Sequence, residues 1–133
     1  MIYLQLFILL LSLVVPLQVR ADLVTDLHNV SVPAKPDGSA YSVEEVQRAI
    51  IGGVQKRGWT AKLEGDGKII ARILVRSRHY AEVEITFTAA AYSITYRDSR
   101  ELDYDKETRD IHGNYNKWVK ILSNTIQQEF GLM

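Results

Sequence analysis

The sequence predicts an α+β protein: a four-stranded antiparallel β-meander with two helices packed on one face, in α-β-β-β-β-α order, preceded by a signal peptide. Apolar residues recur every three to four positions in residues 42–57 and again in 115–130, as in helices with one buried side. Between these segments, from Trp59 to Tyr96, apolar and polar residues alternate, as in strands with one buried face. Because each element has a single apolar face, we expect both helices on the same face of the sheet.

Residues 1–21 have the features of an export signal. A continuous apolar run from Leu6 to Leu11 is followed by Val19-Arg20-Ala21, whose small residues suit signal peptidase. Cleavage is therefore expected after Ala21, which would place the protein in the periplasm. No Lys or Arg precedes the apolar run, so an uncleaved inner-membrane anchor, with the domain facing the periplasm, is the alternative.

Composition excludes several classes of function. The chain has no cysteine, which rules out a disulfide scaffold, a thiolate metal site, a cysteine nucleophile and attachment of a lipid to a lipobox cysteine. Of its 16 basic side chains only Arg20 lies in the predicted signal, so the mature chain carries a net charge of about −1. Since no basic cluster is present, nucleic-acid binding is not expected.

The exported part of the chain is expected to form one domain. Residues 22–40 contain two prolines and the turn-forming Asp37-Gly38-Ser39, which predicts an extended leader. Within it, His28–Val32 is compatible with a short edge strand. Residues 41–133 hold the periodic segments and are predicted to be a single α+β domain.

The first helix has clear start and stop signals. Ser42 and Glu45 have the spacing of a capping box, in which each side chain accepts a hydrogen bond from the other residue's backbone N–H. Gly58 is expected to end the helix. The pair Gly52-Gly53 is unfavourable in a helix and therefore indicates close contact with a neighbour, for which the sheet is the natural candidate.

Four strands are then predicted in series. Their inward-facing residues lie in the segments Trp59–Leu63, Ile69–Val75, Ala81–Phe87 and Tyr92–Tyr96. Gly65-Asp66-Gly67 suits the hairpin loop between the first two. The opposite face carries arginines and glutamates, such as Arg72 and Glu82. We interpret them as solvent-exposed pairs across neighbouring strands rather than as a catalytic pair.

The polar segment 97–114 and the start of the second helix contain the candidate binding residues. Asn114 is predicted to cap this helix, and Tyr115 and Trp118 to begin its apolar side. His112 either holds a loop carbonyl or takes part in chemistry. The spacing of the acidic residues does not match a calcium-binding EF-hand loop, and no metal or cofactor is predicted. The candidate binding residues are His112, Asn114, Tyr115, Asp98, Asp103 and Tyr104.

The motif I-H-x-N-Y-N-x-W-V, here Ile111–Val119, together with the helix Tyr41–Trp59 and the strand at Ser93–Tyr96, resembles a family of small exported bacterial proteins, many of them classed as lipoproteins. The resemblance covers nearly the whole mature chain. It implies a periplasmic α+β domain without an established activity, and it supplies no catalytic residues. The chain departs from the family in lacking the lipobox cysteine, so the resemblance does not imply a lipid anchor here.

These features predict a noncatalytic periplasmic domain that binds a protein or a cell-envelope component. The expected surface is the 97–114 loop with the sheet edge beside it. One alternative is a small hydrolase or metal-dependent enzyme that uses His112 with Asp98, Asp103 or Asp110. It requires the imidazole to lie within hydrogen-bond reach of a carboxylate. The other alternative is an envelope protein held by an uncleaved N-terminal helix, the one case in which membrane contact is expected.

Overall fold

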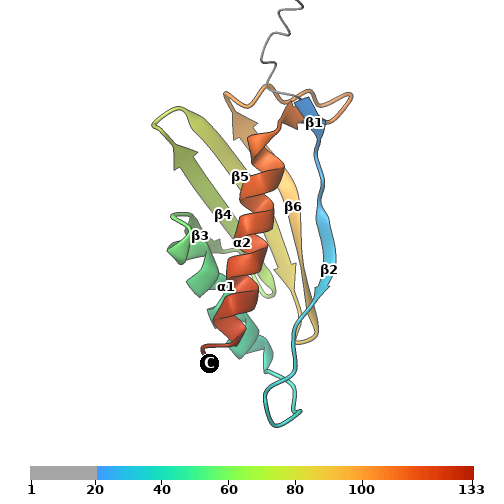
Figure 1. The fold of residues 1–133 in the computed structure, drawn as a ribbon, viewed down its shortest axis with the longest axis vertical. Coiled ribbons are helices and arrows are strands. Elements are labelled where there is room, and N and C mark those ends of the chain that lie inside the picture. The colour runs from blue at the N-terminus through green and yellow to red at the C-terminus, as the bar shows by residue number, and fades with distance from the viewer. Residues whose placement is uncertain (1–20) are drawn as a thin grey trace, which may run out of the picture.

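The computed structural model describes residues 21–133 and confirms the α+β class (Figure 1). Apart from Ala21, the predicted signal peptide lies outside the described residues. None of the helices in the described part of the chain is long and apolar enough to span a membrane. The elements are β1 (Ala21–Leu23), β2 (Leu27–Ser31), α1 (Val43–Lys56), β3 (Thr60–Leu63), β4 (Lys68–Val75), β5 (His79–Phe87), β6 (Ala91–Arg100), β7 (Asp110–His112) and α2 (Asn114–Phe130).

The main sheet has five antiparallel strands, in the order β2-β6-β5-β4-β3, rather than the four predicted. The additional strand is β2, which comes from the leader and pairs with β6 at the sheet edge. Its pairing is irregular between Leu27 and Val30, and Asn29 has a positive φ of 52°. These irregularities break the two-residue alternation, which explains why the strand is only weakly visible in the sequence.

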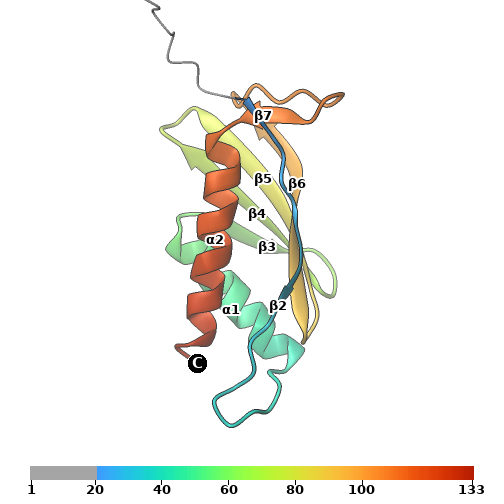
Figure 2. The same cartoon turned by 45° about the vertical axis from the view of Figure 1, so that its right-hand side comes forward.

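The helices α1 and α2 lie side by side on one face of the sheet (Figure 2). A Cβ atom added to Gly53 would lie 2.7 Å from Ile126 Cγ1 and 2.9 Å from Ile126 Cα. The glycine therefore allows the two helices to approach closely. The expectation that Gly52-Gly53 contacts the sheet was wrong: its neighbour is α2. The helix ends as predicted, with Gly58 at a φ of 79° just past the C-terminal turn.

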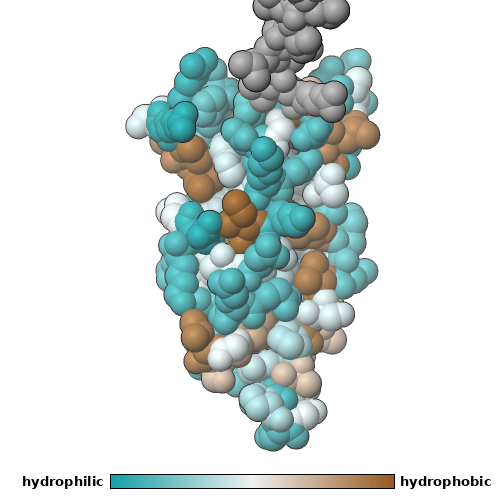
Figure 3. Space-filling view, in the orientation of Figure 1, coloured by the Kyte–Doolittle hydropathy of each residue, from teal (hydrophilic) through white to brown (hydrophobic). Residues whose placement is uncertain are grey.

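One hydrophobic core lies between the helices and the sheet. Seen from the α2 side, the surface is mostly hydrophilic and its apolar patches are separate (Figure 3). The core residues with no exposed surface come from α1, from β4, β5, β6 and β7, and from α2: Val46, Ile50, Val54, Ile69, Ala71, Ala81, Val83, Ile85, Ile94, Ile111, Leu122 and Ile126.

The first described residues are tied to the far end of the chain. β1 pairs with β7 in a separate two-stranded sheet. The Asn116 side chain accepts a hydrogen bond from the Thr25 N–H (2.9 Å) and donates one to the Leu23 carbonyl (2.7 Å). β1, β7 and the β6–β7 connection thus lie together at one end of the molecule, opposite the C-terminus (Figure 1).

Candidate binding site

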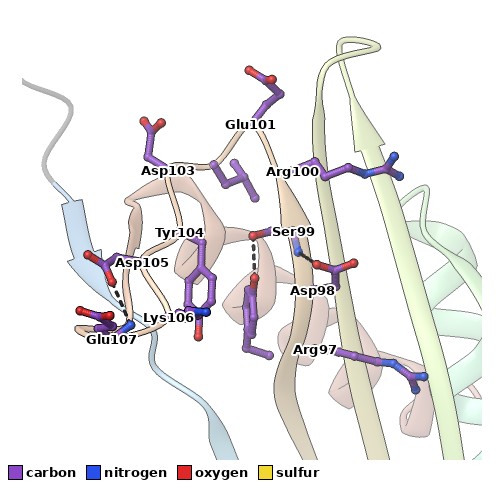
Figure 4. Close-up of a pocket in the computed structure, with 12 residues that line it drawn as sticks. Arg97, Asp98, Ser99, Arg100, Glu101, Asp103, Tyr104, Asp105, Lys106 and Glu107 are labelled. Atoms are coloured by element: carbon purple, nitrogen blue, oxygen red, sulfur yellow. Dashed lines mark hydrogen bonds between the residues drawn. The ribbon is translucent and has the colours of Figure 1, made fainter.

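The end of β6 and the first part of the β6–β7 connection line a hollow of about 830 Å³, which we call the loop hollow (Figure 4). Its lining comes entirely from the continuous segment 96–107. β6 continues to Arg100, so the polar loop begins later than the predicted position 97. The predicted binding residues Asp98, Asp103 and Tyr104 all line this hollow.

Stacked tyrosines fix the base of the loop hollow. The rings of Tyr96 and Tyr104 stack with centroids 4.1 Å apart, and the Tyr96 ring meets Tyr115 edge-on at 5.6 Å. The Tyr96 and Ser99 hydroxyls lie 2.7 Å apart and form a hydrogen bond. Tyr115 is only 1% exposed, and burial raises its pKa well above the usual tyrosine value. It therefore supports the hollow from the core and is not part of the binding surface.

Ion pairing and turn hydrogen bonds hold the rest of the loop. The Arg109 guanidinium donates to the Asp26 carboxylate (3.0 Å), which also accepts the Tyr96 N–H (2.8 Å). This hydrogen bond to Asp26 is the main cause of the raised pKa of Arg109. The Asp105 carboxylate accepts the Glu107 N–H (2.8 Å) and closes a turn. The loop is consequently attached to the leader segment as well as to its own strands.

The exposed rim of the loop combines negative charge with an uncommon backbone. Glu101 and Asp103 have φ values of 57° and 52°, in the left-handed region that residues other than glycine rarely adopt. Between them the side chain of Leu102 is buried and anchors the loop. As Figure 4 shows, the carboxylates of Glu101 and Asp103 extend away from the hollow. Backbone of this kind is concentrated at functional sites.

A second hollow, of about 260 Å³, lies under the start of α2, and we call it the histidine hollow. Because Leu102 lines both hollows, the two adjoin. The rings of His79 and His112 face each other with centroids 6.1 Å apart. The lining residues are Val75, Arg76, His79, Leu102, His112, Asn114 and Trp118.

Both imidazoles are oriented by backbone groups. His79 Nδ1 lies 2.8 Å from the Glu101 carbonyl oxygen and donates to it. His112 Nδ1 accepts the backbone N–H of Asn114 at 3.2 Å. The prediction that Asn114 caps α2 was therefore wrong. Asn114 is the first helical residue, Gly113 before it provides no side-chain hydrogen bond, and the His112 ring takes the acceptor role.

The predicted site residues thus separate into three groups. Asp98, Asp103 and Tyr104 line the loop hollow, His112 and Asn114 line the histidine hollow, and Tyr115 lies in the core. Sequence reasoning missed Asp26, Arg109 and Asn116, whose hydrogen bonds attach the loop and α2 to the first described residues. It also did not connect His79 with His112. The only sequence signal for His79 was its phase with Ala81 and Val83 on the inner face of β5.

The histidine–carboxylate pair that the enzyme alternative needs is not formed. Among residues 21–133, no aspartate or glutamate oxygen lies within 4 Å of a His112 nitrogen. The same described region contains no group of three or more His, Asp or Glu residues placed to hold a metal ion. The His112 ring lies instead near another imidazole, that of His79, with the two planes tilted by 35°.

The outer face of the sheet carries a closed ionic network. The Glu82 carboxylate accepts hydrogen bonds from Arg72 Nε (2.5 Å) and the Tyr80 hydroxyl (2.7 Å), and it forms an ion pair with Arg97, whose Nε lies 3.0 Å away. Hydrogen bonding from Arg72 is the main reason that the pKa of Glu82 is lowered. The predicted pairing of Arg72 with Glu82 is confirmed, but the Glu82 side chain is only 10% exposed. With its oxygens engaged, this carboxylate is structural rather than poised for proton transfer.

Comparisons with models of protein families, with curated proteins and with solved structures found no match to this chain. The resemblance to small exported bacterial proteins therefore stays a prediction.

Proposed function

We propose that this protein is an exported, noncatalytic domain that binds a protein or cell-envelope component through the rim of the loop hollow. One observation carries the proposal: the end of β6 and the connection that follows it line an open hollow on a base fixed by stacked tyrosines, while its charged rim is exposed. Binding residues are commonly held on loops that a rigid scaffold positions. A loop with these supports needs little ordering when a partner arrives, which favours affinity.

The charge of the rim indicates the kind of partner. Segment 97–107 contains five acidic and three basic residues. Two of the bases are directed to the outer face of the sheet, where Arg97 pairs with Glu82 and Arg100 lies over the Tyr80 ring (4.3 Å). Within residues 97–107, Lys106 is then the one basic residue left at the rim of the loop hollow. We expect the partner to present a positively charged surface, because complementary charge guides association.

Export is proposed from the sequence of residues 1–21, with the periplasm as the location. Fractionation followed by N-terminal sequencing tests it, and the expected first residue is Asp22. Recovery of the protein with Met1 intact in the membrane fraction would instead support the anchored form.

Site-specific photocrosslinking in cells tests the binding surface. A photoreactive amino acid at Asp103 should yield a discrete crosslinked species. The same residue at Asp66, in the β3–β4 hairpin, is the matched control and should not yield it. Adding Glu101→Lys to the Asp103 crosslinking variant should reduce the yield several-fold, since it reverses charge at the rim.

Two results would contradict this surface. One is equal crosslinking at positions 103 and 66, which would indicate nonspecific encounters. The other is a crosslink at position 103 that Glu101→Lys leaves unchanged. Circular dichroism and thermal melting of Glu101→Lys should match those of the parent protein, because the Glu101 side chain is exposed and its ion pair with Arg78 is long, at 3.6 Å.

A further inference from the structure

We propose that the histidine hollow is an anion site for a small carboxylate, and that binding places a proton on His79. This site is separate from the rim of the loop hollow and goes beyond the function proposed above. It rests on the composition of the hollow and on the hydrogen bonds that orient the two imidazoles.

The lining of the histidine hollow suits an anion with an apolar body. Its polar members are Arg76, the two histidines and Asn114, and it contains no aspartate or glutamate. Val75, Leu102 and Trp118 supply apolar walls. The hollow is more polar than apolar, and a few converging polar groups of this kind fix the orientation of a small molecule in its site. Within residues 21–133, Arg76 has no carboxylate oxygen within 4 Å, so its charge is free to attract a ligand.

The hydrogen bond of His79 determines where that ring can accept a proton. A carbonyl oxygen only accepts, so the bond to Glu101 requires a hydrogen on His79 Nδ1. In the neutral ring Nε2 is then unprotonated, and among the described residues it has no hydrogen-bond partner. His79 can therefore gain a proton at Nε2 while it keeps its bond to Glu101.

The hydrogen bond of His112 imposes the opposite arrangement. Its Nδ1 accepts the Asn114 N–H, so the hydrogen of the neutral ring is on Nε2. A second proton would have to bind at Nδ1 and would break the hydrogen bond that this nitrogen accepts from the first N–H of α2. His112 is thus a fixed N–H donor, while His79 can gain a proton without losing its hydrogen bond to Glu101.

A carboxylate between the rings requires two donors. His112 Nε2–H provides one at neutral pH, and His79 provides the other only after it takes a proton from solvent. Imidazole is the side chain that ordinarily changes charge between about pH 5 and 8. Binding should therefore consume about one proton, and affinity should rise as the solution is acidified.

The other charged groups around His79 favour an anion. Arg76 and Arg78 come from the β4–β5 turn, and Glu101 from the loop. The Glu101 carboxylate lies 3.6 Å from Arg78 Nε and does not line the hollow. β7 contributes His112, and α2 contributes only the uncharged Asn114 and Trp118.

The same proton positions disfavour a metal. A zinc or copper ion held by both Nε2 atoms needs both lone pairs. The hydrogen of His112 would then move to Nδ1, where it would face the Asn114 N–H at 3.2 Å. The geometry thus distinguishes a carboxylate site from a metal site.

Benzoate is the probe for the test, because its ring can pack against Trp118 while its carboxylate meets the imidazoles. Calorimetric titrations of the purified protein should show one site per chain. The apparent enthalpy should change with the ionisation enthalpy of the buffer, which reports proton uptake. Affinity at about pH 6 should exceed that at about pH 8 by tenfold or more.

Asparagine variants separate binding from folding. In His79→Asn the amide nitrogen can still donate to the Glu101 carbonyl, and in His112→Asn the amide oxygen can still accept the Asn114 N–H, but both lack Nε2. Each should weaken benzoate binding at least tenfold, and His79→Asn should also abolish proton uptake. The control His28→Asn, on the exposed β2 edge, should bind like the parent protein. Melting temperatures verify that all three fold.

The source of the carboxylate is resolved by comparing ligands. A short peptide with a free C-terminal aromatic residue that binds, while its amidated form does not, would assign the site to chain ends; binding of benzoate alone would assign it to small acids. Absence of benzoate binding at millimolar concentration would overturn the proposal. So would tighter binding of inorganic phosphate, zinc binding that needs both histidines, or benzoate binding without proton uptake.

Discussion

The helices α1 and α2 lie on the same face of the sheet, yet different groups hold their first turns. At the start of α1, Ser42 Oγ accepts the Glu45 N–H (3.1 Å) and the Glu45 carboxylate accepts the Ser42 N–H (3.0 Å). At the start of α2, the His112 ring accepts the Asn114 N–H. The capping box of α1 is complete within four residues. The hydrogen bond at the start of α2 forms only when β7 positions the His112 ring.

This difference determines which helix start is connected to the hollows. β7 is held by β1 and by a hydrogen bond from the His112 N–H to the Leu102 carbonyl (2.8 Å). Leu102 lines both hollows, so the start of α2 shares its supports with the candidate binding surfaces. The start of α1 is joined instead to Lys35, whose ammonium lies 3.1 Å from the Glu45 carboxylate. Disturbing α1 should cost stability alone, while disturbing α2 should also alter the site.

The largest effect is expected where the two helices touch. Gly53→Ala should lower the free energy of unfolding by about 1–3 kcal/mol, because the new Cβ would collide with the backbone of Ile126. Denaturation with urea measures it.

Gly52→Ala is the matched control one residue away. There a Cβ would meet only the carboxylate end of Glu129, a flexible side chain that can move. Alanine also favours the helix by roughly 1 kcal/mol relative to glycine, so this variant should be neutral or stabilised. Equal destabilisation by both substitutions would show that the close approach of α1 to α2 is not the cause.

The next effect concerns the local start of α1. Ser42→Ala removes the acceptor for the Glu45 N–H and should cost about 1 kcal/mol of stability. Nuclear magnetic resonance signals of His79 and His112 should not shift, since the capping box is not connected to the hollows. A shift of those signals larger than the shift in α1 itself would contradict the separation of the two helix starts.

The corresponding change in α2 should alter the candidate site and also lower the stability. His112→Ala leaves the Asn114 N–H without its acceptor and should cost about 0.5–1 kcal/mol. The amide signals of Leu102 and Asn114 should shift in the same variant. Asn114→Ala is the control: its side chain makes no capping bond, so stability should change by less than about 0.5 kcal/mol. A larger loss of stability in Asn114→Ala than in His112→Ala would show that Asn114 caps α2 after all.

Sequence reasoning succeeded where structure depends on neighbours along the chain. The capping box at Ser42, the glycine stop at Gly58 and the strands β3 to β6 all follow from local patterns, and each is present. The alternation is incomplete in β3, because Leu63, which was expected to face inward, is 49% exposed. Sequence reasoning failed where the partner is distant. The short edge strand that His28–Val32 suggested is present as β2, but its partner β6 was not predicted, and Gly53 is explained only by Ile126 across the helix pair.

The candidate site shows the same limit. The composition of segment 97–112 marked it as polar and unusual, but its two hollows depend on contacts that spacing does not encode. His79 reaches His112 only because β5 begins beside β7, and Asp26 reaches Tyr96 and Arg109 across more than 60 residues of sequence. Asn114 matched the usual preference for a cap, yet the ring two residues before it took that role.

The smallest effect is the dependence of the α1 cap on pH. The backbone hydrogen bond from Ser42, followed by the contact with Lys35, holds the pKa of Glu45 below its usual value. A lowered pKa in the folded state means that the ionised carboxylate adds stability above the unfolded-state pKa, and that this contribution is lost as the pH falls through the lowered value.

Glu45→Gln can keep the capping hydrogen bond but has no charge. The parent protein should therefore exceed Glu45→Gln in melting temperature at about pH 7, and the two should converge at about pH 3. Glu44→Gln, in the same helical turn but outside the capping box, controls for the general effect of negative charge at a helix start. If the difference between the parent and Glu45→Gln were the same at both pH values, ionisation of Glu45 would have no part in starting α1.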